Sequence, residues 1–273
     1  MDITLLGTGS PIPSPDRAGA ATLVTAGGTR LLVDAGRAVG MRLAAVGVFA
    51  PMLGAVLMTH LHSDHLTDLN DIVTTRWVMS PQPSPLIVYG PPGTRACVDG
   101  LLTMLAPDIG YRIAHHDDLT TGPQVEVREV GAGDRFTIGE AHVIVGASDH
   151  RPVEPSVAYR IEHEGRSVVL GGDGVPCTGL DELCAGADAY VQTVLRADLV
   201  QRIPMARMQD VLDYHSSVEQ AAATAARGGV RHLVLTHYIP AMPAGTEDEW
   251  RALAAAHFDG DIVLGDDLTT LSL

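Results

Sequence analysis

The sequence predicts an α/β protein built from two packed β-sheets with helices on their outer faces. Short β-branched or alternating runs bounded by Gly, Pro and Asp recur in both halves of the chain. Segments with helical periodicity lie between these runs, and no low-complexity linker separates the halves. A chain of 273 residues can hold one large domain or two small ones. Because no linker is visible, we expect a single domain over residues 1–273.

The predicted strands fall into two groups along the chain. The first group covers residues 3–6, 21–25, 30–33, 55–59 and 86–88. The second group covers residues 124–130, 142–147, 157–162, 167–170, 190–193, 231–236 and 261–263. Strand clusters that occur twice, each with interspersed helices, predict two sheets rather than one.

Helical periodicity predicts helices over residues 38–46, 66–79, 94–104 and 206–214. The clearest helix follows Ser216 and Ser217, where Ser216 and Glu219 have the spacing of a capping box. This helix is expected to run through an Ala-rich stretch and to end at Gly228 and Gly229, because glycine readily adopts the left-handed conformation that terminates helices.

Composition excludes several classes of protein. With 18 Lys+Arg against 33 Asp+Glu the net charge is −15, which opposes a basic polyanion-binding protein. All the basic residues are arginine, which removes Schiff-base and P-loop lysine chemistry. No apolar run is long enough to span a membrane, and the start lacks a basic signal-peptide region, so we expect a soluble cytoplasmic protein. Three irregularly spaced cysteines predict buried free thiols: Cys97, Cys177 and Cys184.

The densest group of candidate ligands follows the predicted strand 55–59. The segment Thr-His-Leu-His-Ser-Asp-His places His60, His62, Asp64 and His65 within six residues. Residues i and i+2 of an extended segment point the same way, so the first two histidines can hold one cation. The chain then turns into the next helix and offers Asp64 and His65 to a second cation. A polar turn that contains three histidines by chance is the alternative, and the density of mixed ligands disfavours it.

Two metal ions need more ligands than this segment supplies, and three further candidates end other strands. His150 follows strand 142–147, Asp173 follows strand 167–170, and His237 directly ends strand 231–236. A single His or Asp at a strand end is usually a cap or a solvated turn residue. Three of them in addition to the first cluster favour a binuclear metal site.

The combination of His-x-His-x-Asp-His, a later His, an Asp after an apolar strand and a final His resembles the metallo-β-lactamase superfamily of binuclear metallohydrolases. Several segments are similar to its ribonuclease Z branch: ITLLGTGS at 3–10, LLVDAG at 31–36, Asp149-His150 with AYRI at 158–161, YHSS at 214–217 and LTHYIP at 235–240. The similarity covers nearly the whole chain.

The resemblance implies a four-layer αββα sandwich and a homodimer. It also implies that His60, His62 and His150 hold one zinc ion, that Asp64, His65 and His237 hold the other, and that Asp173 bridges the two. Mn²⁺ or iron are alternative metals for these ligands. An Asp rather than a Cys at position 173 is unlike the true zinc β-lactamases, which places antibiotic hydrolysis below other reactions.

The chain also departs from typical ribonucleases Z, which carry a long Gly- and Pro-rich arm that grips transfer RNA. At the corresponding junction this chain has only residues 162–166, which predict a tight hairpin. The usual Gly-Asp-Thr reads Gly172-Asp173-Gly174 and so loses a hydroxyl beside the bridging carboxylate.

Three residues outside the ligand set are candidates to take part in the chemistry or to orient the side chains that do, and the ligand Asp64 is a further catalytic candidate. His215 is the expected proton donor to the leaving group, because it precedes a capped helix and the resembling family uses this His at the phosphate. Asp213 is a candidate to orient it, with an exposed carboxylate as the alternative. Asp34 ends an apolar strand and is a candidate to orient a ligand His, with a turn-forming Asp as the alternative.

We therefore expect a zinc-dependent phosphodiesterase in which a metal-bridging hydroxide attacks phosphorus, with Asp64 and His215 as catalytic residues. Acidity, 4% aromatic residues and the missing arm favour small phosphodiester substrates and weak or no nucleic-acid binding. An arylsulfatase, lactonase or β-lactamase with the same metal core is the alternative. A transfer-RNA 3′-processing enzyme and a metal-binding module without turnover rank below these.

Overall fold

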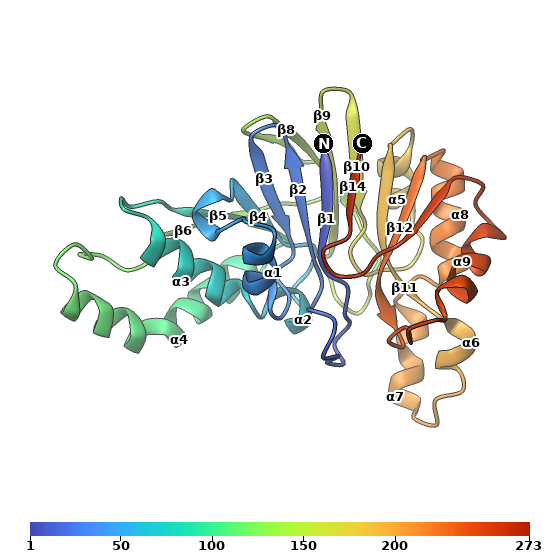
Figure 1. The fold of residues 1–273 in the computed structure, drawn as a ribbon, viewed down its shortest axis with the longest axis horizontal. Coiled ribbons are helices and arrows are strands. Elements are labelled where there is room, and N and C mark those ends of the chain that lie inside the picture. The colour runs from blue at the N-terminus through green and yellow to red at the C-terminus, as the bar shows by residue number, and fades with distance from the viewer.

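Two seven-stranded sheets pack face to face in the computed structural model, which describes residues 1–273 (Figure 1). The first sheet has the order β14-β1-β2-β3-β4-β5-β6 and the second has the order β13-β12-β11-β10-β9-β8-β7. Helices cover the outer face of each sheet, so the predicted α/β class and its αββα layering are confirmed.

In the first sheet, β14 (Thr270–Ser272), β1 (Asp2–Gly7), β2 (Ala21–Ala26) and β3 (Thr29–Val33) pair in antiparallel fashion. The sheet continues in parallel through β4 (Ala55–Leu57), β5 (Leu86–Gly90) and β6 (Val125–Glu129). The second sheet begins with parallel β13 (Asp261–Leu264), β12 (His232–Ile239), β11 (Ala189–Leu195) and β10 (Arg166–Leu170). It ends with antiparallel β9 (Val157–His163), β8 (Ala141–Ala147) and β7 (Arg135–Ile138).

The core has three layers because most strands are buried on both faces. Successive residues of a strand point to opposite sides, so Leu5 packs between the sheets whereas Leu6 packs against the outer helices of the first sheet. Likewise, Leu31 packs between the sheets and Leu32 packs against the outer helices. This two-sided burial explains why the strands appear in the sequence as continuous apolar runs rather than as alternating ones.

The first sheet is covered by α1 (Val39–Ala45), α3 (Leu69–Met79) and α4 (Thr94–His115). The second sheet is covered by α5 (Thr178–Cys184), α8 (Val218–Gly228) and α9 (Glu247–Ala255). Three short helical segments complete the fold near the lower edge in Figure 1: α2 (Ser63–Leu66), α6 (Ala197–Val200) and α7 (Ala206–Gln209). None of the helices combines the length and apolar character that a membrane crossing requires.

Several predicted boundaries are wrong in detail. The predicted helix 66–79 is α3 preceded by the separate α2, and the predicted helix 206–214 is α7 followed by a 3₁₀ turn, Asp210–Asp213. Helix α4 continues to residue 115 past Pro107, where the sequence pattern predicted an end at 104. The capping box of α8 consists of Ser217 and Gln220 and not of Ser216 and Glu219.

Candidate metal centre

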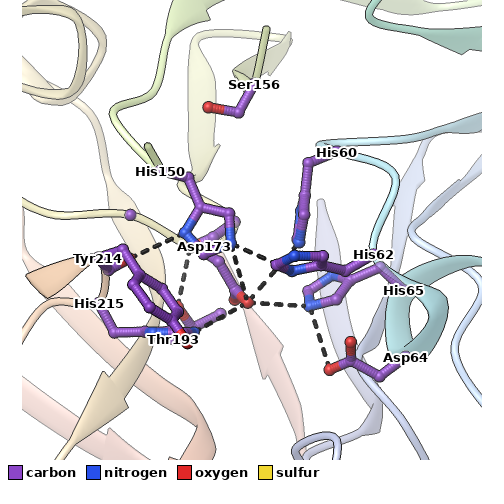
Figure 2. Close-up of polar contacts among 12 residues, drawn as sticks. His60, His62, Asp64, His65, His150, Ser156, Asp173, Thr193, Tyr214 and His215 are labelled. Atoms are coloured by element: carbon purple, nitrogen blue, oxygen red, sulfur yellow. Dashed lines mark hydrogen bonds and ion pairs between the residues drawn. The ribbon is translucent and has the colours of Figure 1, made fainter. Parts of the chain in front are cut away.

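The predicted ligands lie on segments of both sheets, and Figure 2 shows six of them close together: His60, His62, Asp64, His65, His150 and Asp173. His60 follows β4, His62 is the N-cap of α2, and Asp64 and His65 belong to α2. The other three come from the second sheet: His150 follows β8, Asp173 follows β10 and His237 lies in β12. Six of the seven are at most 5% exposed, and only His62 is half-buried.

Their ligand atoms form two groups that share the region around Asp173. Atoms of His60, His62, His150 and Asp173 lie within 4.8 Å of one another, and so do atoms of Asp64, His65 and His237. Atoms of Asp173, His215 and His237 form a third group within the same distance of one another. This division matches the two ligand sets that the family resemblance implies.

Asp173 stands between the two groups. Its Oδ2 lies 3.3 Å from His65 Nε2, 3.7 Å from His237 Nε2 and 3.8 Å from His60 Nε2. Its distance to His150 Nε2 is 4.0 Å. One carboxylate oxygen therefore faces imidazoles of both groups, which is the placement that a bridging ligand requires.

The hydrogen bonds on the outer side of each imidazole fix its orientation. Thr59 Oγ1 donates to Asp34 Oδ2 at 2.8 Å, so His60 Nδ1, 3.0 Å from the same hydroxyl, is the donor in that pair. His65 Nδ1 donates to Asp34 Oδ2 at 2.8 Å. With the proton on Nδ1, both rings present the lone pair of Nε2 to the centre, as a metal-binding imidazole does.

His150 is held in the same way by a backbone group. Its Nδ1 lies 2.8 Å from the carbonyl oxygen of Tyr214, which can only accept a hydrogen bond. The Nε2 atom therefore carries the free lone pair and faces the centre. Nothing in the side chains around position 214 signals this contact in the sequence, and it was not predicted.

Asp34 occupies the position proposed for it as the orienting carboxylate. Besides the two contacts at Oδ2, its Oδ1 accepts from Thr59 N at 2.8 Å. Asp34 is 5% exposed, and Thr59 is 1% exposed. Thr59 was not singled out from the sequence, although a threonine directly before the first ligand His, at a strand end, is a recognisable signal.

The donor set fits a pair of divalent metal ions. His60 Nε2, His65 Nε2 and Asp173 Oδ1 are buried polar atoms without a hydrogen-bond partner. Leaving such atoms unpaired costs about 1–3 kcal/mol each, and ligation of a metal would satisfy them. Imidazole and carboxylate without thiolate is a donor set that suits zinc, manganese or iron.

The protonation states at neutral pH also favour cation binding. Burial, followed by the charge of His65, holds the pKa of His60 well below its ordinary value, and burial lowers the pKa of His150 to about 4. Burial alone would raise the pKa of Asp173, but the neighbouring His237, His65 and His215 outweigh it and hold this pKa well below the ordinary value. The neutral imidazoles of His60 and His150 therefore face an ionised carboxylate. Burial alone would lower the pKa of His65, but the charges of Asp173 and Asp34 outweigh it and hold this pKa well above its ordinary value.

His215 lies beside the two groups. Its Nε2 is 3.2 Å from Asp173 Oδ2 and its Nδ1 is 3.2 Å from the carbonyl oxygen of Val211. Asp213 is exposed and forms no hydrogen bond or ion pair, so the suggestion that it orients His215 is wrong. The backbone carbonyl of Val211 orients His215 instead, by accepting a hydrogen bond from its Nδ1.

The junction between β9 and β10 is a tight hairpin, as the sequence predicted. His163 pairs with Arg166, and only Glu164 and Gly165 form the turn. The chain therefore has no inserted arm at this position.

Comparison with known proteins agrees with this geometry. The β-lactamase superfamily domain matches residues 29–238. Ribonuclease Z of Mycolicibacterium gilvum is 58% identical over 270 residues, covering 98% of this chain and 94% of that protein. Ribonuclease Z of Mycobacterium tuberculosis H37Rv is 55% identical over 270 residues, covering 98% of this chain and 96% of that protein.

Solved structures support the fold. Human tRNase Z, short form, has a TM-score of 0.73 at 24% identity and covers 100% of this chain and 99% of its own. The metallo-β-lactamase fold protein YhfI of Bacillus subtilis has a TM-score of 0.75 at 20% identity, covering 99% of this chain and 98% of its own. Since the domain match spans most of the chain and the mycobacterial relatives align over nearly all of it, this protein is a metal-dependent hydrolase that belongs to the ribonuclease Z branch of the metallo-β-lactamase superfamily.

Proposed function

We propose that this protein is a phosphodiesterase of the ribonuclease Z type that uses two zinc ions to cleave RNA, with Asp64 and His215 as catalytic residues. The observation that carries the proposal is the division of seven ligand side chains into two groups around Asp173. In this proposal one ion is held by His60, His62 and His150, the other by Asp64, His65 and His237, and both by Asp173.

A pair of bound divalent ions would supply a hydroxide at neutral pH and stabilise charge on the phosphoryl oxygens. The residues of the chain contribute orientation and a proton. Asp34, Thr59 and the Tyr214 carbonyl fix three of the imidazoles, so the site is formed before the substrate arrives. His215 has Nδ1 directed at the Val211 carbonyl and Nε2 directed at the centre, where a protonated Nε2 can donate to the leaving oxygen.

The relatives change the ranking of substrates. The missing arm favoured small diesters in the sequence analysis, but the alignment covers 94% or more of relatives that are themselves named ribonuclease Z. Such coverage leaves no room for a long arm in those proteins either. The missing arm therefore does not separate RNA from small diesters, and we place RNA, with transfer-RNA 3′ ends as the substrate class, first.

Small phosphodiesters are the second candidate, because a net charge of −15 and 4% aromatic residues leave little for gripping RNA. Aryl sulfates, lactones and β-lactams rank below both. Family membership removes the alternative of a binding module without turnover.

We also propose a homodimer in the cytoplasm. Support for self-association comes from apolar side chains that remain exposed on and near α1 and α3, namely Met41, Phe49 and Met79. Sedimentation of the purified protein at micromolar concentration tests this part, and a monomer there would contradict it.

One assay tests the function. The purified protein is loaded with zinc, its metal content is measured, and cleavage of precursor transfer RNA is compared with hydrolysis of bis(p-nitrophenyl) phosphate. We expect two zinc ions per chain and cleavage of the RNA at its 3′ side. Asp64→Ala should lower the rate on both substrates by at least about 100-fold, since even indirect partners of a metal cost about 10–100-fold.

His215→Ala should lower kcat by about 10²–10⁴-fold and leave the metal content unchanged. The matched control is Asp213→Ala, whose exposed carboxylate makes no hydrogen bond or ion pair and which should behave as the wild type. A wild-type protein that cleaves neither substrate while it holds two zinc ions contradicts the proposed reaction.

A further inference from the structure

Polar side chains from three parts of the chain converge on the backbone that carries Asp173. The carbonyl oxygen of Gly172 accepts from Gln192 Nε2 at 3.0 Å and from Thr193 Oγ1 at 2.9 Å. The carbonyl oxygen of Asp173 accepts from Ser148 Oγ at 3.0 Å. Ser216 Oγ donates to the carbonyl oxygen of Gly174 at 2.7 Å. Each of the three consecutive carbonyls is therefore held by at least one side chain.

Gln192 is the most unexpected of these residues. It is 0% exposed and lies in β11, a strand in which all seven residues are buried. Burying an amide in such a strand is unfavourable unless its donors and acceptor are paired. Its Nε2 donates to the carbonyls of Gly172 and Thr193, and its Oε1 accepts from the Tyr190 hydroxyl at 2.6 Å.

The Tyr190 hydroxyl on one side and two backbone carbonyls on the other orient the Gln192 amide. Burial raises the pKa of the Tyr190 phenol well above its ordinary value, so the hydroxyl keeps its proton and acts as a donor. The amide oxygen accepts a hydrogen bond from this hydroxyl, and the carbonyls of Gly172 and Thr193 can only accept. The amide nitrogen is left on the opposite side, directed at the Gly172 carbonyl.

Gly171 and Gly172 pack closely against Gln192 and Thr59. Gly172 has φ 64°, and a Cβ there would lie 2.8 Å from the Cβ of Thr59. A Cβ on Gly171 would overlap Oε1 of Gln192. The backbone before Asp173 is thus enclosed between Gln192 on β11 and Thr59, the residue that also contacts Asp34 and His60.

We propose that Gln192, oriented by Tyr190 and assisted by Thr193, is the positioning residue for the bridging carboxylate of Asp173. This inference rests on the proposed metal-dependent function. Gln192 acts through the Gly172 carbonyl and touches neither metal nor substrate. Loss of its amide leaves the Thr193 hydroxyl as the one side chain that holds the Gly172 carbonyl, so we expect the peptide before Asp173 to be held less firmly and Asp173 Oδ2 to be positioned less precisely between the two ligand groups.

The test compares Gln192→Leu and Tyr190→Phe with the wild type. Zinc affinity is measured by competition with a chromophoric chelator, and the coordination of Co²⁺ is read from its visible absorption spectrum. We expect Gln192→Leu to weaken zinc binding by about 10–100-fold and to alter the Co²⁺ spectrum. Tyr190→Phe should have a smaller effect in the same direction. On bis(p-nitrophenyl) phosphate, kcat should fall while KM stays near the wild-type value.

Thr193 supplies a matched pair. Thr193→Ser keeps the hydroxyl and should bind zinc as the wild type does, whereas Thr193→Val removes the hydroxyl and should weaken binding. Ser167→Ala is the control for loss of a buried hydroxyl elsewhere, because Ser167 is 5% exposed at the start of β10, away from Asp173.

The outcomes separate this inference from the proposed function. A wild-type protein without bound zinc or turnover overturns both. An active wild type whose Gln192→Leu variant keeps full zinc affinity, and loses only thermal stability in the metal-free form, overturns the positioning role alone. Thr193→Ser and Thr193→Val with equal zinc affinities would remove the assisting role of the hydroxyl.

Discussion

The backbone conformation of Gly172 affects the whole candidate metal centre. Its φ of 64° lies in the left-handed region, which costs a residue with a Cβ about 1–2 kcal/mol. Gly186 has the same φ of 64°, but a Cβ added there would meet no atom within 4 Å, whereas a Cβ on Gly172 would meet Thr59 at 2.8 Å. A comparison of alanine substitutions at the two glycines therefore separates the effect of backbone strain from the effect of steric contact.

We expect Gly186→Ala to lower the free energy of unfolding by about 1–2 kcal/mol and to leave zinc binding unchanged. Gly172→Ala should lower the free energy of unfolding further and also weaken zinc binding, because the displaced Thr59 holds both Asp34 and His60. Urea denaturation of the metal-free proteins and zinc titration of the folded ones measure the two effects. Equal zinc affinities for the two variants would show that Thr59 is not displaced.

Sequence reasoning found the residues whose side chains carry recognisable chemistry and missed those that act through the backbone. The seven proposed ligands are histidines and carboxylates in or shortly after strands and in the short helix α2, and the structure brings them together. The hydrogen bonds accepted by the backbone carbonyls of Tyr214 and Val211 cannot be predicted from residue types. Gln192 did leave a signal, since it is an uncharged polar residue inside an apolar strand, but the partner that explains it is 20 residues away.

Among the elements, α8 shows how a cap position depends on tertiary contacts. Two adjacent serines precede the helix, and either could cap it. Ser217 does so, accepting from Gln220 N at 3.2 Å, while Gln220 Oε1 accepts from Ser217 N at 2.9 Å. Ser216 instead donates to Gly174 O. A pattern of local spacing could not distinguish the two, because the competing partner comes from the loop after β10.

We expect Ser217→Ala to lower the free energy of unfolding by about 1 kcal/mol, the usual cost of losing an N-cap side chain, and to leave zinc affinity unchanged. Ser216→Ala keeps the cap, so any loss of zinc affinity in that variant comes from the contact with Gly174. Chemical denaturation and zinc titration of both variants check the assignment. A larger loss of stability from Ser216→Ala than from Ser217→Ala would be evidence for the cap that the sequence predicted.

Elements with strong periodicity were predicted, and elements defined by distant partners were not. Strand β14 has three residues and exists because it pairs with β1 at the other end of the chain, Asp2 opposite Ser272. Helix α4 continues through Pro107, a residue at which the sequence pattern predicted no continuation. Most of α4 beyond Val98 is partly or fully exposed, so the carbonyl that loses its partner can be solvated.

At the scale of the molecule, the proposed ligands divide between the two sheets. His60, His62, Asp64 and His65 follow β4 of the first sheet, and the remaining three belong to segments of the second sheet. Bound metal would therefore link the sheets as well as form the active site. A metal that binds only the folded state raises the free energy of unfolding by about 4 kcal/mol when its free concentration is about 1,000 times its Kd.

The rate at which Cys184 is alkylated can measure how much bound metal stabilises the folded protein. Cys184 is 0% exposed, packs in the outer core of the second sheet, and burial raises the pKa of its thiol to about 12. At pH 8 only about one thiol in 10,000 is then ionised in the folded protein, whereas an unfolded cysteine with a pKa near 8.5 is ionised to about a quarter. Alkylation of Cys184 therefore requires unfolding around it, while Cys97 and Cys177 are only partly buried.

We expect iodoacetamide at pH 8 to modify Cys97 and Cys177 first and to spare Cys184 while zinc is bound. Chelation should lower the Tm by several degrees and, if alkylation of Cys184 proceeds through global unfolding, raise its rate by up to about 1,000-fold, the factor that corresponds to about 4 kcal/mol. Peptide mass spectrometry over time measures each cysteine separately. If chelation accelerates Cys177 but leaves the rate at Cys184 unchanged, the metal does not stabilise the core around Cys184 on the outer face of the second sheet, and its role is confined to the loops of the centre.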